Sequence, residues 1–323
     1  MALIVAPSLV EPMARGLLGC VSANEGPTLE QQRLLQAFVS HLWSRPDIAV
    51  NRLEPITAGE LGSCLVDRED RQTFHQLQVT LEFCRHPQTP EQLQLGEAYA
   101  EALGVSSAAR MVAHDLLHKG MDKAADDVAR TFNSFLPLRS EPSLAREPVS
   151  ASEPELDLAR RIQAFSKLPE GTLGRGLMHY YERFGIPIPG LEACALNHLY
   201  VAHDSTHVIA GIAATGAGEI ALSAFQLAMQ DNPINESALL ASLITHEAGF
   251  VSANPTIQPD RACLNTPMAA QMLAQEMARG SRCSGDFSLV DHFDLAPMPL
   301  DEVRRQFNVE APADLDDGHH FLW

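Results

Sequence analysis

Apolar residues recur along the chain at intervals of three and four positions, the spacing of one face of an α-helix. In the first such stretch, residues 28–43, they are Leu29, Leu34, Leu35, Phe38, Val39 and Leu42. Thr28 and Gln31 stand at its start with the spacing of a helix-capping box. Residues 70–84 repeat the pattern with Phe74, Leu77, Leu81 and Phe83. We therefore expect a helix over each stretch.

Helix start and stop signals extend this pattern. Thr89 and Pro90 mark the cap and first position of a helix that Gly104 ends. Residues 106–132 continue as one or two helices. Further helices are expected near residues 155–166, 172–184, 191–212, 218–230, 235–249, 266–279 and 299–307. The strict alternation of a strand is nearly absent, so the pattern predicts an all-α protein.

Residues 137–155 interrupt the helical pattern. They are rich in proline and serine, at Pro137, Ser140, Pro142, Ser143, Pro148, Ser150, Ser152 and Pro154. Such composition is typical of a linker. We therefore expect two helical domains, residues 1–136 and residues 156–323, joined by this segment.

Composition and charge narrow the function classes. Hydrophobic residues make up 46% of the 323 residues, enough to bury two cores. The net charge is −18, from 23 basic and 41 acidic residues. This balance argues against nucleic acid and an anionic membrane surface as partners, since both attract basic proteins. The six cysteines lack the spacing of a metal finger, and no export signal or spanning stretch is evident. We expect a cytoplasmic protein, with peripheral membrane attachment as the alternative.

The segment around residues 199–219 carries the most informative chemistry. His203 and His207 are four residues apart, so a helix projects both imidazoles from one face. Asp204 can bind a metal from the edge of that face or orient an imidazole. Glu219 opens the next predicted helix. These four residues predict a site for one divalent metal: zinc, with iron or manganese as alternatives. They are also the candidate catalytic residues, because such a ligand set leaves coordination positions open.

An earlier segment has the same spacing, with His114, Asp115 and His118. Arg130 stands where the later motif has its glutamate, and Lys119 and Lys123 stand beside the histidines. A cation next to a metal is unfavourable, so we interpret this segment as a solvated helix face. Elsewhere, we expect Tyr180 and Tyr181 to be packing residues, with the lining of a ligand groove as the alternative. We expect His246 to be buried and satisfied, with a contact to substrate or to a metal ligand as the alternative. His319–His320 is expected to be a flexible tail.

The later motif resembles that of the Coq4 family of ubiquinone-biosynthesis proteins: His203-Asp204-x-x-His207, eleven residues, then Glu219. The resemblance extends over about residues 165–310. Its further segments are Leu168–Arg175 (LPEGTLGR), Gly218–Leu222 (GEIAL), Met298–Arg304 (MPLDEVR) and Phe307–Val309.

This resemblance implies a helical fold, a zinc-type metal and a groove for a prenyl chain. It also implies a role in ubiquinone biosynthesis, at the ring carbon that loses its carboxylate and gains oxygen, or in organising other enzymes. Two departures concern substrate contacts. Ser205 and Thr206 stand where members have an aromatic residue, and residues 197–202 lack the family's arginine.

The N-terminal half resembles the TerB-like helical domains found with tellurite-resistance proteins. The resemblance lies in Gly16–Phe38 and in the later hairpin Leu81–Val105. Asn24 and Glu25 occupy the turn where those domains place acidic ligands, but Asn24 replaces the usual aspartate. We interpret both as turn residues, with a second metal site at this turn as the alternative.

Three functions remain open from the sequence. The first is a metal-dependent lyase or oxidative decarboxylase acting on a prenylated aromatic acid. The second is a non-enzymatic isoprenoid-lipid-binding scaffold with a structural metal. The third is a metal-dependent hydrolase, which needs further His and Asp ligands that the sequence does not place. The expected partners are a prenylated quinone precursor or isoprenoid lipid and other quinone-biosynthesis proteins. A homodimer is one alternative for the oligomeric state.

Overall fold

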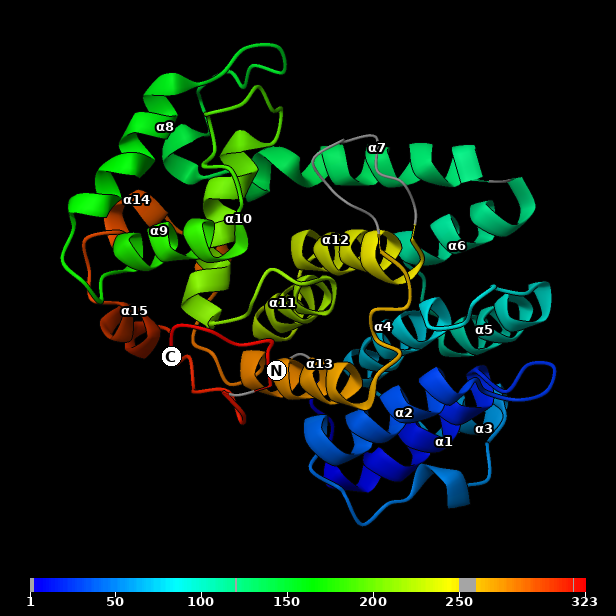
Figure 1. The fold of residues 1–323 in the computed structure, drawn as a ribbon. Coiled ribbons are helices and arrows are strands. Elements are labelled where there is room, and N and C mark those ends of the chain that lie inside the picture. The colour runs from blue at the N-terminus through cyan, green and yellow to red at the C-terminus, as the bar shows by residue number, and fades with distance from the viewer. Residues whose placement is uncertain (1–2, 120, 250–259, 316) are drawn as a thin grey trace. The chain divides into compact units, whose positions relative to one another are not determined.

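The computed structural model describes residues 3–119, 121–249, 260–315 and 317–323 (Figure 1). These residues form helices and loops with two isolated β-bridges, and they contain no strand. The prediction of an all-α protein is therefore confirmed. Within the same residues, no helix combines the length and the apolar character needed to cross a membrane.

The chain divides into two compact units. The first comprises Met1–Phe132 and Glu219–Ser281, and the second comprises Asn133–Gly218 and Arg282–Trp323. Two of the three divisions fall inside helices, α7 (Met121–Arg139) and α11 (Gly216–Met229), and the third follows Ser281. The predicted linker, residues 137–155, belongs to the second unit. The division into two consecutive domains stays a prediction.

The first unit contains the N-terminal helices and a later helical segment. Its α-helices are α1 (Val10–Cys20), α2 (Leu29–Ala37), α3 (Ala58–Cys64), α4 (Arg68–Phe83), α5 (Pro90–Leu103), α6 (Ala108–Lys119), most of α7 (Met121–Arg139) and α11 (Gly216–Met229), α12 (Pro233–Ser242) and α13 (Pro267–Gly280). Its 3₁₀ turns are η1 (Pro7–Leu9) and η3 (Val50–Arg52), and its π-helical turns are η2 (Phe38–Leu42) and η6 (Leu243–Glu247). Helix α13 packs against α2 and η2.

Local sequence signals explain where several of these helices begin and end. The Thr28 side chain accepts a hydrogen bond from Gln31 N–H, and the Gln31 side chain bonds Thr28 N–H in return. Thr89 caps α5, Pro90 takes its first position, and Gly104 ends it in the left-handed conformation. These contacts satisfy backbone groups that a helix end otherwise leaves open. The predicted capping box and α5 boundaries are thus confirmed.

The second unit is built around α10. Its elements are η4 (Pro142–Leu144), α8 (Leu156–Gln163), η5 (Ala164–Lys167), α9 (Leu173–Phe184), α10 (Asn197–Ala210), η7 (Phe287–Leu289), α14 (His292–Leu295) and α15 (Leu300–Gln306). Helix α10 packs against α9, α14, α15 and η7 (Figure 1). Most residues of α10 are buried, including polar ones.

Residues of the predicted linker hold the start of α10 in place. The Glu155 carboxylate accepts hydrogen bonds from the Asn197 side chain at 2.8 Å and from His198 Nε2 at 2.9 Å. The Glu141 backbone N–H donates to the His198 carbonyl at 2.9 Å. The buried Glu141 carboxylate also bonds the backbone N–H and Nδ1 of His292. This proline- and serine-rich segment therefore supports α10 through both of these glutamates.

The C-terminal residues pack against the other end of α10. Ala213 N–H donates to the His319 carbonyl at 2.8 Å, and Phe321 N–H donates to the Gly211 carbonyl at 3.0 Å. His320 is buried, and its Nδ1 lies 2.8 Å from the Asp317 carboxylate. The prediction of a flexible tail at His319–His320 was therefore wrong, because these backbone bonds tie the segment to the loop after α10.

Arg304 satisfies the last carbonyl groups of α10. Its guanidinium donates to the carbonyls of Ile209 at 3.0 Å, Val208 at 3.1 Å and Leu322 at 2.7 Å. The same group stacks on the Trp323 ring, 3.8 Å from the ring centroid. Arg304 is only 5% exposed, so its removal leaves these acceptors without solvent to replace it.

We predict that Arg304→Ala lowers the free energy of unfolding by about 3 kcal/mol, because buried carbonyls lose a charged donor. Urea unfolding followed by circular dichroism measures the loss. Arg305→Ala, at an exposed neighbouring position, is the control and should change stability by less than about 0.5 kcal/mol. Equal effects of the two substitutions would contradict this assignment of Arg304.

Candidate metal centre

The end of α10 fixes the orientation of His207. Gly211 follows the helix in the left-handed conformation, with φ of 72°, and its N–H donates to the His207 carbonyl. This reversal is available to glycine at little cost. It turns the chain back so that the Ile212 carbonyl lies 2.9 Å from Nδ1 of the His207 ring. The ring therefore meets a backbone acceptor from the turn that ends its own helix.

The bond to Ile212 determines which nitrogen of neutral His207 carries the proton. A carbonyl oxygen only accepts hydrogen bonds, so Nδ1 must be the donor. Nε2 of the neutral ring then keeps its lone pair, the state that binds a metal. His207 is fully buried, and its ring stacks on Tyr180 with 5.4 Å between centroids. Packing and hydrogen bonding together hold the ring in one orientation.

His203 presents its Nε2 to the same point. The two Nε2 atoms of His203 and His207 lie 3.2 Å apart, one helical turn from each other along α10. Two nitrogen ligands of a tetrahedral zinc ion lie about 3.4 Å apart, since each bond is about 2.0–2.1 Å long. The spacing of the imidazoles therefore fits a shared metal. His203 is partly exposed, whereas His207 is buried.

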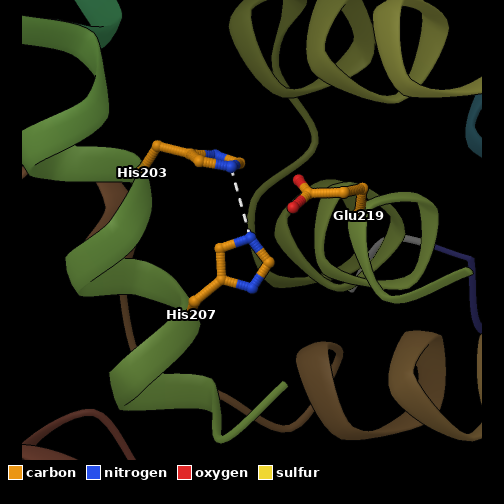
Figure 2. Close-up of side chains that lie close together, drawn as sticks. All are labelled: His203, His207 and Glu219. Atoms are coloured by element: carbon orange, nitrogen blue, oxygen red, sulfur yellow. Dashed lines mark hydrogen bonds between the residues drawn. The ribbon is translucent and has the colours of Figure 1, made fainter. Parts of the chain in front are cut away.

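Glu219 supplies the third donor, from the first turn of α11. Figure 2 shows its carboxylate facing the two imidazoles. One ligand atom from each of His203, His207 and Glu219 lies within 4.8 Å of the other two. We call these three residues the candidate metal centre.

The loop between α10 and α11 explains why Glu219 has this position. Thr215 Oγ1 accepts a hydrogen bond from Gly218 N–H at 3.0 Å and thereby caps the start of α11. Gly218 also passes very close to the Ala213 carbonyl oxygen: a Cβ atom at this position would lie 2.0 Å from that oxygen. A residue with a side chain would push the first turn of α11 away, so glycine before Glu219 is a packing requirement.

Asp204 is not one of these three clustered donors. It is 4% exposed on α10 and faces the buried hydroxyl of Tyr181. Burial raises the pKa of Tyr181, and the charge of Asp204 raises it further. The role of Asp204 as a metal ligand or as a positioning carboxylate stays a prediction.

Tyr180 and Tyr181 are packing residues, as predicted. They are 1% and 4% exposed. The ring of Tyr180 also contacts Phe184 and Phe321, at centroid distances of 5.2 and 5.7 Å. These aromatic rings form an apolar wall beside His207 that keeps water from its buried side.

His246, in the π-helical turn η6, is electrostatically linked to Glu219. Burial lowers the pKa of His246, and the Glu219 carboxylate opposes this effect. The expectation of a satisfied, buried side chain was wrong for His246, because its ring is half-buried and its Nδ1 has no hydrogen-bond partner among the described residues. Its role in positioning Glu219 or contacting a substrate stays a prediction. The Ile212 carbonyl and the stacked Tyr180 are contacts that the sequence did not indicate. Gly211, placed directly after the helix, was the one signal for the turn that supplies Ile212.

The earlier motif of the same spacing has other partners. Asp115 forms ion pairs with Lys119 at 2.7 Å and Lys123 at 3.4 Å. The hydrogen bond from Lys119, followed by that from His114, lowers the pKa of Asp115. His118 is exposed. The exposure of His118 and of the lysines agrees with the predicted solvated helix face, whereas Asp115 is buried. His114 and His118 therefore provide a natural control for the candidate metal centre.

Comparisons with known proteins place few limits on the function. No family model matches the chain, and no curated protein matches it. Among solved structures, a candidate ubiquinone biosynthesis protein from Nostoc punctiforme PCC 73102 is 20% identical, with a TM-score of 0.32. The match covers 75% of this chain and 98% of that protein.

We predict that His207→Ala, combined with Glu219→Ala, removes about one equivalent of zinc per chain, because only one donor of the candidate metal centre remains. Elemental analysis after equilibration with zinc and removal of the excess measures the change. The control, His114→Ala with His118→Ala, removes two histidines of the same spacing and should leave zinc content at the wild-type value. The assignment fails if the first pair of substitutions leaves the zinc content unchanged.

A second prediction concerns Gly211. Gly211→Ala should weaken zinc binding about 10-fold, because the left-handed turn that brings the Ile212 carbonyl to His207 becomes strained. Its Cβ would also lie 3.1 Å from the Trp323 ring. Gly185→Ala is the matched control: Gly185 has φ of 64° and open space around it, at the end of α9. It should cost about 1 kcal/mol of stability, with zinc affinity, measured by competition with a chelating dye, unchanged.

Proposed function

We propose that the chain binds one divalent metal, zinc, at the candidate metal centre and uses it to handle a prenylated aromatic acid of ubiquinone biosynthesis. The convergence of His203, His207 and Glu219 on one point carries this proposal. The donor set, two imidazoles and one carboxylate, is suited to zinc, iron or manganese. Zinc fits best among them, since three protein donors and an open position are typical of catalytic zinc.

The protonation state of the residues in the candidate metal centre, like their spacing, is suited to binding a metal. The bond from Nδ1 to Ile212 keeps Nε2 of neutral His207 unprotonated. A metal at the centre would replace the proton that the two Nε2 atoms of His203 and His207 otherwise share. Glu219 adds the negative charge that favours a divalent cation.

A metal bound here supplies Lewis acidity, which polarises a carboxylate or carbonyl group or lowers the pKa of a bound water. The chain's own residues would orient the reaction. Tyr180 excludes water from one side of His207, and the partly exposed His203 leaves an approach for a ligand. Asp204, buried beside Tyr181, is the remaining carboxylate for holding or moving a proton.

The substrate class is inferred from the sequence resemblance. Two of the segments that carry the resemblance contain residues that stabilise the structure around α10 and α11. Gly218 permits the close approach to Ala213, and Arg304 satisfies the end of α10. The departures from the family pattern have a simple structural account: Ser205 and Thr206 bond the carbonyls four residues earlier in the same helix. Their hydroxyls are therefore hydrogen-bonded within α10. Neither residue has an aromatic ring on which a substrate ring could stack.

A non-enzymatic scaffold is the second candidate, favoured by the complete burial of His207. In that case the metal ties α10 to the start of α11, and the chain binds an isoprenoid lipid without converting it. A metal held only in the folded state adds about 2.7 kcal/mol of stability at 100 times its dissociation constant.

The test measures binding and conversion of a prenylated hydroxybenzoate by the zinc-loaded chain, with mass spectrometry of the products. We expect product from the wild-type chain and a loss of at least about 100-fold in His207→Ala, because the metal is lost with its buried ligand. The His114→Ala, His118→Ala chain should keep wild-type turnover. Full turnover by His207→Ala would exclude the enzymatic proposal. Tight zinc-dependent binding with no product from any form would favour the scaffold.

A further inference from the structure

The first unit contains a second group of metal-ligating side chains. Ligand atoms of Glu30, His86 and Glu247 all lie within 4.8 Å of one another. Glu30 lies in the first turn of α2, His86 follows α4, and Glu247 ends the π-helical turn η6. We call these three residues the acidic histidine group. It is separate in sequence and composition from the candidate metal centre, and it has two carboxylates where the centre has one.

The group is built into the protein interior. The side chain of Glu247 is 0% exposed and that of Glu30 is 6% exposed, whereas that of His86 is 24% exposed. Glu247 is held at both oxygens: Oε1 lies 2.7 Å from His86 Nε2, and Oε2 accepts the Leu264 N–H at 2.9 Å. Two further backbone bonds, Asp260 N–H to the Thr245 carbonyl and Ala262 N–H to the Glu247 carbonyl, fix the turn around it.

Glu30 is the member that protein contacts leave incompletely satisfied. Its Oε2 lies 4.0 Å from His86 Nε2, beyond hydrogen-bond distance. Its Oε1 is buried and has no hydrogen-bond partner among the described residues. A buried acceptor without a partner costs free energy, and more so when it is charged. The geometry thus leaves a coordination-capable oxygen in the interior beside an imidazole and a second carboxylate.

The electrostatics of the region show excess negative charge. Burial raises the pKa of Glu30 to about 8, and the next largest causes are the charge of Glu247 and a hydrogen bond between the two carboxyl groups. Burial likewise raises the pKa of the Cys84 thiol, with Glu247 and Glu30 adding to the effect. The charge of Arg33 acts against these effects on Glu30. A divalent cation held by both carboxylates would neutralise both of their negative charges. A single proton, or a single imidazolium, neutralises only one of them.

We propose that Glu30, His86 and Glu247 bind a second divalent transition-metal ion, independent of the ion at the candidate metal centre. One imidazole nitrogen and two carboxylates are suited to zinc or manganese, and the nitrogen disfavours calcium and magnesium. The 2.7 Å contact between His86 and Glu247 is a hydrogen bond in the metal-free chain. Metal binding replaces its proton, and the partial exposure of His86 leaves room for water as a further ligand. The function of this ion is structural, since it joins α2, the segment after α4 and η6.

Zinc titration of the full-length chain, stripped of metal with a chelator, tests the proposal. We expect about two equivalents to bind the wild type. Glu30→Gln with Glu247→Gln should bind one, retained at the candidate metal centre. His203→Ala with His207→Ala should also bind one, retained at the acidic histidine group. Glu91→Gln, an exposed carboxylate in the same unit, is the control and should bind as the wild type does. A wild-type stoichiometry that Glu30→Gln with Glu247→Gln leaves unchanged would overturn the proposal.

Thermal melting of the single variant Glu30→Gln separates loss of metal from loss of fold. Without metal, this nearly isosteric variant should melt at or above the wild-type temperature, because it removes one of two facing carboxylates. With zinc, in a His203→Ala, His207→Ala background, the chain that keeps Glu30 should gain melting temperature, and the chain that also carries Glu30→Gln should not. An equal zinc-induced shift in both chains would show that Glu30, His86 and Glu247 form only a hydrogen-bonded cluster.

Cobalt provides a direct view of the ligands. In the His203→Ala, His207→Ala background, cobalt bound at the acidic histidine group should give visible absorption bands that His86→Gln abolishes. Bands of unchanged position and intensity in His86→Gln would exclude His86 as a ligand and contradict the proposal.

Discussion

The hydrogen bond from His207 Nδ1 to the Ile212 carbonyl is the interaction on which the candidate metal centre depends. An imidazole binds a metal only through a nitrogen that is free of its proton, and a buried ring needs a partner for the other nitrogen. The carbonyl meets both requirements at once. No additional side chain is needed, because the backbone of the turn after α10 supplies this carbonyl.

That turn is held by contacts from distant parts of the second unit. Gly211 provides the left-handed backbone, and the His319 carbonyl accepts the Ala213 N–H. Arg304 satisfies the carbonyls of Val208 and Ile209 immediately before it. At the other end of α10, Glu155 bonds Asn197 and His198. The helix that carries the imidazoles is thus anchored at both ends, which is what a preorganised ligand pair requires.

The sequence predicted those features that depend on short-range patterns. Periodicity indicated the helices, the Thr28–Gln31 spacing indicated a capping box, and the interval between His203 and His207 indicated that both imidazoles share one face. Other features depend on partners remote in sequence. The composition of residues 137–155 is that of a linker, and nothing within the segment shows that Glu141 and Glu155 bond residues near 198 and 292. Every residue has a backbone carbonyl, so residue type could not identify the Ile212 carbonyl as a hydrogen-bond acceptor.

The two groups of donors differ in how their donor atoms are hydrogen-bonded when no metal is bound, and this difference follows from their charges. His203 and His207 are neutral donors that can share a proton between their Nε2 atoms, and Glu219 is partly exposed to solvent. Glu30 and Glu247 are both buried, and one imidazole at 2.7 Å from Glu247 cannot serve both carboxylates equally. Since an uncompensated buried carboxylate is costly, Glu30 must be protonated or bound to a cation. The first group therefore has the features of a site for chemistry, with an accessible imidazole and a stable metal-free form. The second has the features of a site whose cation completes the packing of the unit around it.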